Sequence, residues 1–323
     1  MLNIGTTSPR VPGGPAYFMR HRDDEVHNVG SNNASSDYLE IWTVELDWVN
    51  SSNSVFSQLA NVEVSEFDSD LCGLTSFFCF PQPGTTQTLD PLREVLMWRL
   101  QYRNFTSYET LVGNLVTDVD GTDHGGVRWF ELRRTGGGVW GLHQEGTIAP
   151  DADHRWMGSA AMNYDGDIAV GYSVSGTTTF PSIAYTGRKA GDTLGTMPQG
   201  ETILKAGTSS QAWVDRWGDY SSLNIDPVDD TTFWYTNEYM PGSQFWETQI
   251  GEFAFDDPDV NIFATVGNDN ILVRRNGINI EVFFDSQLVK SLAIATLNSL
   301  EIHGLNGNDT LTVDHTGGMI TAS

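Results

Sequence analysis

Short segments that alternate large and small side chains are the feature that most constrains the fold of this chain. In the segment 167–174, DIAVGYSV, large residues alternate with Ala169, Gly171 and Ser173. A period of two places the large and the small side chains on opposite faces of a β-strand. Similar runs, bounded by Gly, Asp, Asn and Pro, recur along most of the chain, and helical periodicity is almost absent. The sequence therefore predicts an all-β protein in which sheets approach one another closely.

The predicted strands fall into units that repeat at intervals of roughly sixty residues. Arg155-Trp156 opens one unit and Arg216-Trp217 opens the next, so we expect the two pairs to occupy one structural place, the loop that enters the first strand. Four-stranded antiparallel units in series are typical of β-propeller blades. The expected units are 14–93, 94–154, 155–215 and 216–256. We predict about four blades within residues 1–256, in a four-bladed or incomplete ring; the alternative is a plain β-sandwich.

The units loosely resemble the sialidase-like, BNR-type propellers of secreted bacterial proteins over roughly residues 15–255. The Asp-box turn of that family is approached by Arg133–Trp140, RRTGGGVW, in which Gly137 and Trp140 match. Thr135 stands where the family has Asp, and Arg133 where it has Ser. In the family this turn lies away from the active site, so the resemblance implies the fold. It leaves glycan binding and glycoside hydrolysis as alternative functions.

Residues 257–323 contain no Trp or Tyr and are expected to form a small β-rich C-terminal appendage. Within it, Gly304–Leu311, GLNGNDTL, resembles the Gly/Asp-rich repeat of secreted RTX-type calcium-binding proteins, with Leu305 in place of Gly. Val266–Leu272, VGNDNIL, is a weaker copy. The resemblance implies calcium binding and export. Because the two copies are far apart in the chain, we expect them not to stack, and ordinary hairpin turns are the alternative.

The charge balance and the cysteines bear on partners and compartment. With 42 acidic and 17 basic residues, the net charge of -25 disfavours nucleic acid and anionic membrane surfaces as partners. No apolar run is long enough for membrane insertion. The N-terminal segment lacks the basic and apolar regions of a signal peptide, so the targeting segment of a secreted or cell-surface protein would lie upstream. Cys72 and Cys79 form either a local disulfide or two buried thiols.

Polar and aromatic residues near the predicted strand ends are the ligand-binding candidates. They are His124, Asp153, His154, Arg155, Trp156, Arg216, Trp217 and Asp219. Gathered on one rim, they would suit an extracellular glycan or surface polymer, because aromatic faces stack on sugar rings while charged groups bind hydroxyls. Alternatively, the Arg and Trp residues brace neighbouring blades. No catalytic residue can be assigned; a glycan-cleaving enzyme would need Asp153, Arg155, Arg216 and Asp219 to converge.

Two patterns are candidates for metal binding. Asp118, Asp120 and Asp123 surround Gly121 in DVDGTD, which suits calcium or, alternatively, a solvated hairpin tip. His21 and His27 flank the acidic run in HRDDEVH. A zinc site built from three His on separate blades is an alternative, but it is not preferred because no two of them are at zinc-ligand spacing. The sequence establishes no cofactor, and calcium is the one candidate. A secreted or cell-surface propeller that binds glycans is the preferred function, and a glycoside hydrolase fragment or an adhesive structural protein are the alternatives.

Overall fold

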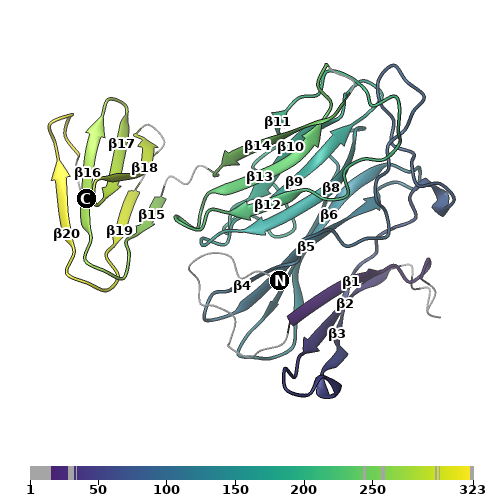
Figure 1. Ribbon diagram of the computed structural model, residues 1–323, viewed down its shortest axis with the longest axis horizontal. Helices are drawn as coiled ribbons and strands as arrows, with labels where there is room; N and C mark the ends of the chain where they lie inside the picture. The colour runs from purple at the N-terminus through teal and green to yellow at the C-terminus, as the bar shows by residue number, and fades with distance from the viewer. Residues whose placement is uncertain are drawn as a thin grey trace. The chain divides into compact units, whose positions relative to one another are not determined.

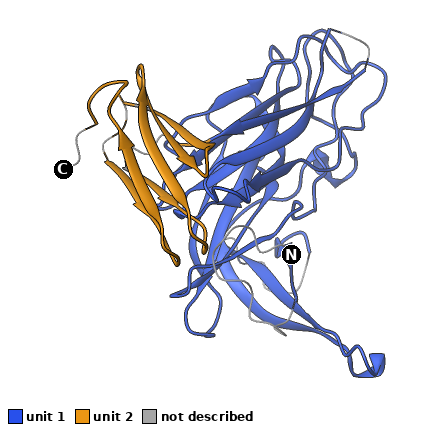
Figure 2. Cartoon of the chain, turned by 60° about the vertical axis from the view of Figure 1, so that its left-hand side comes forward, with its two compact units in different colours: residues 1–253 blue, residues 254–323 orange. Residues whose placement is uncertain are grey.

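The computed structural model describes residues 16–27, 33, 35–242, 245–255, 259–294, 297 and 299–320. The N-terminal segment examined for a signal peptide lies outside these residues. The chain divides into two compact units, residues 1–253 and 254–323, shown in different colours in Figure 2. Sequence composition places this division after residue 256. The described residues include no helix that is long and apolar enough to cross a membrane.

The first unit consists of four antiparallel sheets that follow one another in chain order (Figure 1). The first sheet contains β1 (Ala16–Arg22), β2 (Ser36–Glu45) and β3 (Val55–Ser65). The second contains β4 (Gln101–Asn104), β5 (Glu109–Asp118), β6 (Gly125–Arg134) and β7 (Gly141–Ile148). The third contains β8 (His154–Met162), β9 (Ile168–Ser175), β10 (Ser182–Arg188) and β11 (Thr202–Lys205). The fourth contains β12 (Ser222–Ile225), β13 (Phe233–Tyr239) and β14 (Glu247–Phe253).

Every neighbouring pair of strands in these sheets is antiparallel. The structure thus confirms the predicted all-β class of serial antiparallel sheets. The first and fourth sheets have three described strands each, where four were predicted. In the first unit of the sequence, the chain after β3 leaves the sheet for a long irregular segment, 66–100, before β4 begins.

The second sheet is covered on both faces, as expected for an inner blade. Leu111 of β5 packs in a cluster with residues of the first sheet, among them Leu39 and Ile41. Its neighbour Val112, on the opposite face, packs with Val170 and Tyr172 of the third sheet. Because successive side chains of a strand point to opposite faces, one strand contributes to two cores. A two-layer sandwich would leave one of these faces to solvent.

The third and fourth sheets approach closely where the sequence places small residues. β13 packs against β9 and β10. A Cβ atom added at Gly171 of β9 would lie 2.5 Å from the ring of Tyr235. Ile168, Val170 and the other large residues of β9 lie in the cluster shared with the second sheet. The predicted division of β9 into a large face and a small face is confirmed.

The irregular segment 66–100 is fastened to the sheets by a disulfide and an apolar cluster. Cys72 and Cys79 are disulfide-bonded, which settles the alternative that the sequence left open. Cys72 begins the short 3-10 helix η2 (Cys72–Leu74); a similar turn, η1 (Ser51–Asn53), precedes β3. Phe80 and Met97 are buried with Trp156 and Trp217 in one cluster. The segment therefore packs on the ends of the second, third and fourth sheets.

The second unit contains six strands in two sheets. They are β15 (Asp259–Phe263), β16 (Asn270–Asn276), β17 (Asn279–Phe284), β18 (Gln287–Ala293), β19 (Ser299–His303) and β20 (Thr310–Asp314). β15 pairs with β19, and β16 with β20, in parallel. The remaining neighbours, β16 with β17 and β17 with β18, are antiparallel.

The parallel pairs overturn one expectation about this unit. The copies at Val266–Leu272 and Gly304–Leu311 lie side by side: the backbone N–H of Asp269 donates to Asp309 at 3.0 Å, and that of Asn308 donates to Asn268 at 2.8 Å. The intervening hairpin β17–β18 returns the chain to the start of the next turn, so distance along the sequence does not prevent stacking. Each copy of the turn recurs only after a whole hairpin.

Candidate functional site

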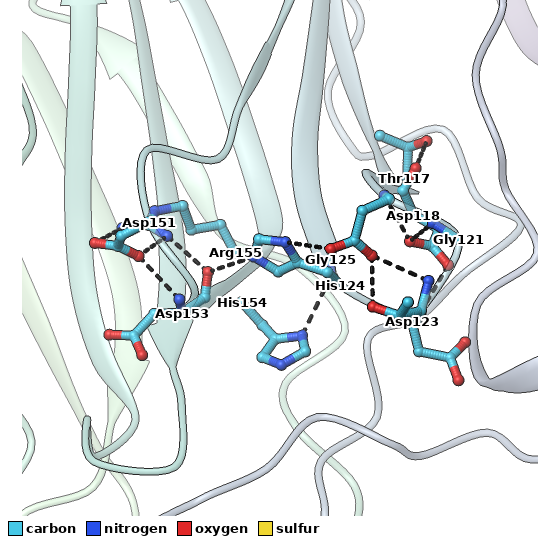
Figure 3. Close-up of polar contacts among 12 residues, drawn as sticks. Thr117, Asp118, Gly121, Asp123, His124, Gly125, Asp151, Asp153, His154 and Arg155 are labelled. Atoms are coloured by element: carbon cyan, nitrogen blue, oxygen red, sulfur yellow. Dashed lines mark hydrogen bonds and ion pairs between the residues drawn. The ribbon is translucent and has the colours of Figure 1, made fainter.

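Residues at the ends of the second and third sheets form a junction, defined here as His124, Asp153, His154 and Arg155 (Figure 3). A ring nitrogen of His124 lies 3.2 Å from the carbonyl oxygen of Asp153. The backbone N–H of Gly125 donates to Nδ1 of His154 at 3.2 Å, and the two imidazole rings are 5.4 Å apart. Burial lowers the pKa of His154 to about 4, with a smaller contribution from His124. Four of the predicted ligand-binding residues therefore do come together.

Arg155 holds this junction together through the protein's own carboxylates. Its guanidinium donates to both oxygens of Glu201 and both oxygens of Asp151, at 2.7–3.1 Å, and to the Asp153 carbonyl at 2.7 Å. Burial lowers the pKa of Arg155, but the hydrogen bonds to Glu201 and Asp151 outweigh it, so the pKa is raised. The side chain is fully buried. These contacts use the five N–H donors of a guanidinium.

The second Arg-Trp pair lies in different surroundings from the first. Arg216 is exposed and pairs with Asp90 and with Asp219. Arg155-Trp156 lies inside β8, where the pairing with β9 shifts after Trp156, whereas Arg216-Trp217 lies in the loop before β12. The rings of Trp156 and Trp217 are 5.9 Å apart in one buried cluster. The expectation that the pairs are copies of one structural place is wrong: they contact each other.

The three aspartates of the predicted calcium site shape their own turn. Asp118 accepts backbone N–H groups of Asp120, Gly121 and Asp123 at 2.7–3.1 Å. Asp120 accepts from Thr122, and Asp123 accepts from the backbone of Cys72. As the structure describes these three aspartates, their carboxylate oxygens do not all lie within 4.8 Å of one another. Calcium binding here stays a prediction.

A cavity of about 800 Å³ opens elsewhere in the first unit. Its walls come from β1, from the segment before β4, and from β12 to β14 with the residues that precede them. The lining residues are Tyr17, Phe18, Met19, Leu96, Met97, Trp98, Arg99, Leu100, Tyr220, Ser221, Ser222, Thr236, Asn237, Glu238, Trp246 and Thr248. None of the predicted ligand-binding residues is among them.

Aromatic side chains dominate the accessible wall of this cavity. Trp98 is 54% exposed, Tyr220 53% and Trp246 49%. The backbone N–H of Met97 donates to Asn114 of β5 at 2.9 Å, and the Met97 side chain is buried. This attachment turns the next residue, Trp98, outward. Trp48 and Trp213 are exposed as well but do not line the cavity, whereas the half-exposed indoles of Trp98 and Trp246 lie beside a concave surface.

Polar groups on the same wall are fixed in position. Arg99 donates to the side chain of Asn224 at 2.6 Å, and its guanidinium carbon lies 5.6 Å from the centre of the Trp98 ring. Burial lowers the pKa of Arg99. Burial, together with the charge of Asp219, raises the pKa of Glu238 although the Gly218 N–H donates to it. Asn237 donates to Ser173 at 3.0 Å and to Tyr235 at 2.9 Å. The cavity therefore combines flat apolar faces with positioned donors and acceptors.

Sequence reasoning missed this cavity because its residues lie in segments predicted to be strands. Trp98 and Arg99 fall in the run EVLMWRLQYRN, and only its last four residues form β4. Trp246 lies immediately before β14. The available signal was a Trp next to a charged residue, Trp98-Arg99 and Trp246-Glu247, at the edge of a strand.

Comparisons with known proteins add little to this geometry. No family model and no curated protein matches the chain. Among solved structures, it is similar to a mutant of the α-L-arabinofuranosidase of Fusarium graminearum in complex with an iminosugar inhibitor, at 11% identity over 68% of each chain, with a TM-score of 0.29. A likeness of this size carries no weight for fold or function.

Proposed function

We propose that the first unit binds a saccharide of an extracellular glycan in the cavity between β1, the segment before β4, and β12–β14. The observation that carries this proposal is the pair Trp98 and Trp246, both about half exposed on the wall of an 800 Å³ cavity. An indole face covers the C–H face of a sugar ring, and the polar edge of the ring then needs hydrogen-bonding partners.

The cavity supplies those partners close to the indoles. Arg99 lies beside Trp98, and Thr236, Asn237 and Glu238 come from β13. Because burial raises the pKa of Glu238, its carboxyl group is easier to protonate than an exposed glutamate and can then donate as well as accept. Sugar hydroxyls need both kinds of partner.

Binding without cleavage is the simpler proposal. Glycoside hydrolysis by the usual route uses two carboxyl groups on either side of the scissile bond. Of the described residues that line the cavity, one is a carboxylate, Glu238. The residues proposed for a hydrolase do not meet in the cavity, and Arg155 is occupied by Asp151 and Glu201.

An extracellular setting agrees with the proposal. The disulfide Cys72–Cys79 is of a kind that persists in oxidising compartments. The net charge of -25 disfavours polyanionic partners such as nucleic acid. We therefore propose a secreted or cell-surface protein whose partner is a glycan or surface polymer.

The proposal is tested on an array of neutral and acidic oligosaccharides with the wild-type chain and the variants Trp98→Ala and Trp246→Ala. For any glycan that the wild type binds, we expect each variant to raise the dissociation constant at least about 10-fold, because the contact between the sugar and the indole is lost. Trp48→Ala is the matched control, since Trp48 is 89% exposed and does not line the cavity.

Two results would contradict the proposal: an array without binding, or binding that Trp48→Ala weakens as much as Trp98→Ala does. A parallel screen of chromogenic glycosides separates the two functions. Turnover that Glu238→Gln abolishes would replace binding with hydrolysis as the function of the cavity.

A further inference from the structure

Two histidines and a glutamate meet at the end of β1. His21 is the penultimate residue of that strand, His27 closes the turn that follows it, and Glu94 lies in the irregular segment before β4. One nitrogen of each histidine and one carboxylate oxygen all lie within 4.8 Å of one another. These three residues are called the His–Glu cluster.

The distances between the side-chain atoms of the cluster are close to those between residues that bind one common ion. Nε2 of His27 is 2.6 Å from Oε2 of Glu94, and Nε2 of His21 is 3.7 Å from the same oxygen. The two imidazole rings are 5.3 Å apart and nearly perpendicular. Glu94 therefore lies between two nitrogens that both face it.

His21 is left without a hydrogen bond. Its side chain is 4% exposed, and neither ring nitrogen has a hydrogen-bond partner among the described residues. The Glu94 oxygen at 3.7 Å is beyond hydrogen-bond length. One face of the ring is packed near Phe67. Because buried polar groups are nearly always paired, this imidazole points to a partner other than the described protein groups.

The Asp23 backbone orients the imidazole ring of His27 through the second ring nitrogen, Nδ1. Its Nδ1 lies 2.9 Å from the carbonyl oxygen of Asp23 and 3.1 Å from the Asp23 backbone nitrogen, in the turn closed by the backbone bond from His27 N–H to Asp23. In the tautomer that carries its proton on Nδ1, the ring donates to this carbonyl, as metal-ligating histidines usually do, and Nε2 is then the nitrogen that can coordinate a metal. The turn thus presents Nε2 of His27 toward Glu94.

We propose that His21, His27 and Glu94 bind one divalent transition-metal ion, with zinc as the best match. Imidazole nitrogen and carboxylate oxygen are ligands that Zn²⁺ accepts, and three protein ligands leave a fourth tetrahedral position for water. The side chains of His27 and Glu94 are 34% and 28% exposed, so this fourth position is open to solvent, whereas His21 closes the inner side.

Metal binding needs only a small movement. Ligands of a tetrahedral zinc ion at about 2.0–2.1 Å from the metal are separated by more than 3 Å from one another. The His21–Glu94 distance of 3.7 Å already allows this, and the shorter His27–Glu94 contact must open. Both partners in that contact are partly exposed, so they can move without disturbing the core.

The test is titration of the full chain, freed of metal, with Zn²⁺ by isothermal calorimetry, with Co²⁺ absorption as a second readout of ligand geometry. We expect one ion per chain, and we expect His27→Gln and Glu94→Gln to weaken Zn²⁺ binding at least about 100-fold, more than loss of a supporting residue alone. His315→Gln, the same change at an exposed histidine of the second unit, should bind as the wild type does.

Circular dichroism on each variant establishes that it is folded; His27→Gln and Glu94→Gln are preferred to a change at buried His21 for this reason. The proposal is overturned if no Zn²⁺ binds at 1:1 stoichiometry, or if folded His27→Gln and Glu94→Gln retain wild-type affinity. It is also overturned if His315→Gln loses as much affinity as they do. None of these results depends on the saccharide proposal, because the readout is the metal alone.

Discussion

Arg155 illustrates how the same residue types can serve ligand binding or architecture. An arginine beside aspartates, histidine and tryptophan suits a sugar-binding rim, which is what the sequence indicated. In the structure, Glu201, far along the chain in the segment before β11, provides the second carboxylate that occupies the guanidinium. Nothing near Arg155 in the sequence identifies this partner, so a ligand-binding rim could not be distinguished from an ion pair within the third sheet.

We predict that Arg155→Met lowers the free energy of unfolding by roughly 3 kcal/mol, because the ion pair loses its buried member and Glu201 keeps, among the described residues, only the hydroxyl of Tyr172 as a partner. Urea denaturation measures this change. Arg216→Met, at an exposed arginine, should cost less than about 1 kcal/mol. If Arg155→Met were as stable as the wild type but no longer bound glycans, the ligand-binding interpretation of this residue would be restored.

β9 is the element in which sequence pattern and packing agree most closely. Its alternation of large and small residues predicts one face for a bulky core and one for a close approach. Gly171 meets the ring of Tyr235 on the small face, while Val170 and Tyr172 fill the core shared with the second sheet. The segment before β4 is the opposite case: its alternating pattern predicts a strand, but an isolated bridge from Leu96 to Leu115 and the backbone bond from Met97 N–H to Asn114 join it to β5 before β4 begins.

The close packing of β9 against Tyr235 can be tested by a substitution that adds one methyl group at Gly171. Gly171→Ala places a Cβ atom 2.5 Å from the Tyr235 ring, and we expect a loss of roughly 1–3 kcal/mol of stability, as for other overpacked cores. Gly141→Ala is the control, since a Cβ atom there has no neighbour within 4 Å. Thermal and urea unfolding of both variants give the comparison. Equal stability of the two variants would mean that the third and fourth sheets do not pack in this way.

For the whole first unit, the serial order of the sheets can be predicted from local sequence patterns, but the position and lining of the cavity cannot. Strands, turns and their serial grouping are local properties that alternation and turn residues encode. The cavity is assembled from residues 17–19, 96–100 and 220–248, which no local pattern connects. The His–Glu cluster has the same origin, because Glu94 is 67 residues from His27. Sites that join distant segments become visible only when the fold is known.

The crystal structure of the chain with the best-bound oligosaccharide from the array tests the central proposal most directly. We predict a sugar ring lying against the indole of Trp98 or Trp246, with hydrogen bonds to side chains of the cavity such as Arg99 or Glu238. A saccharide bound instead at the junction of His124, Asp153 and His154, or anywhere outside the cavity, would contradict it.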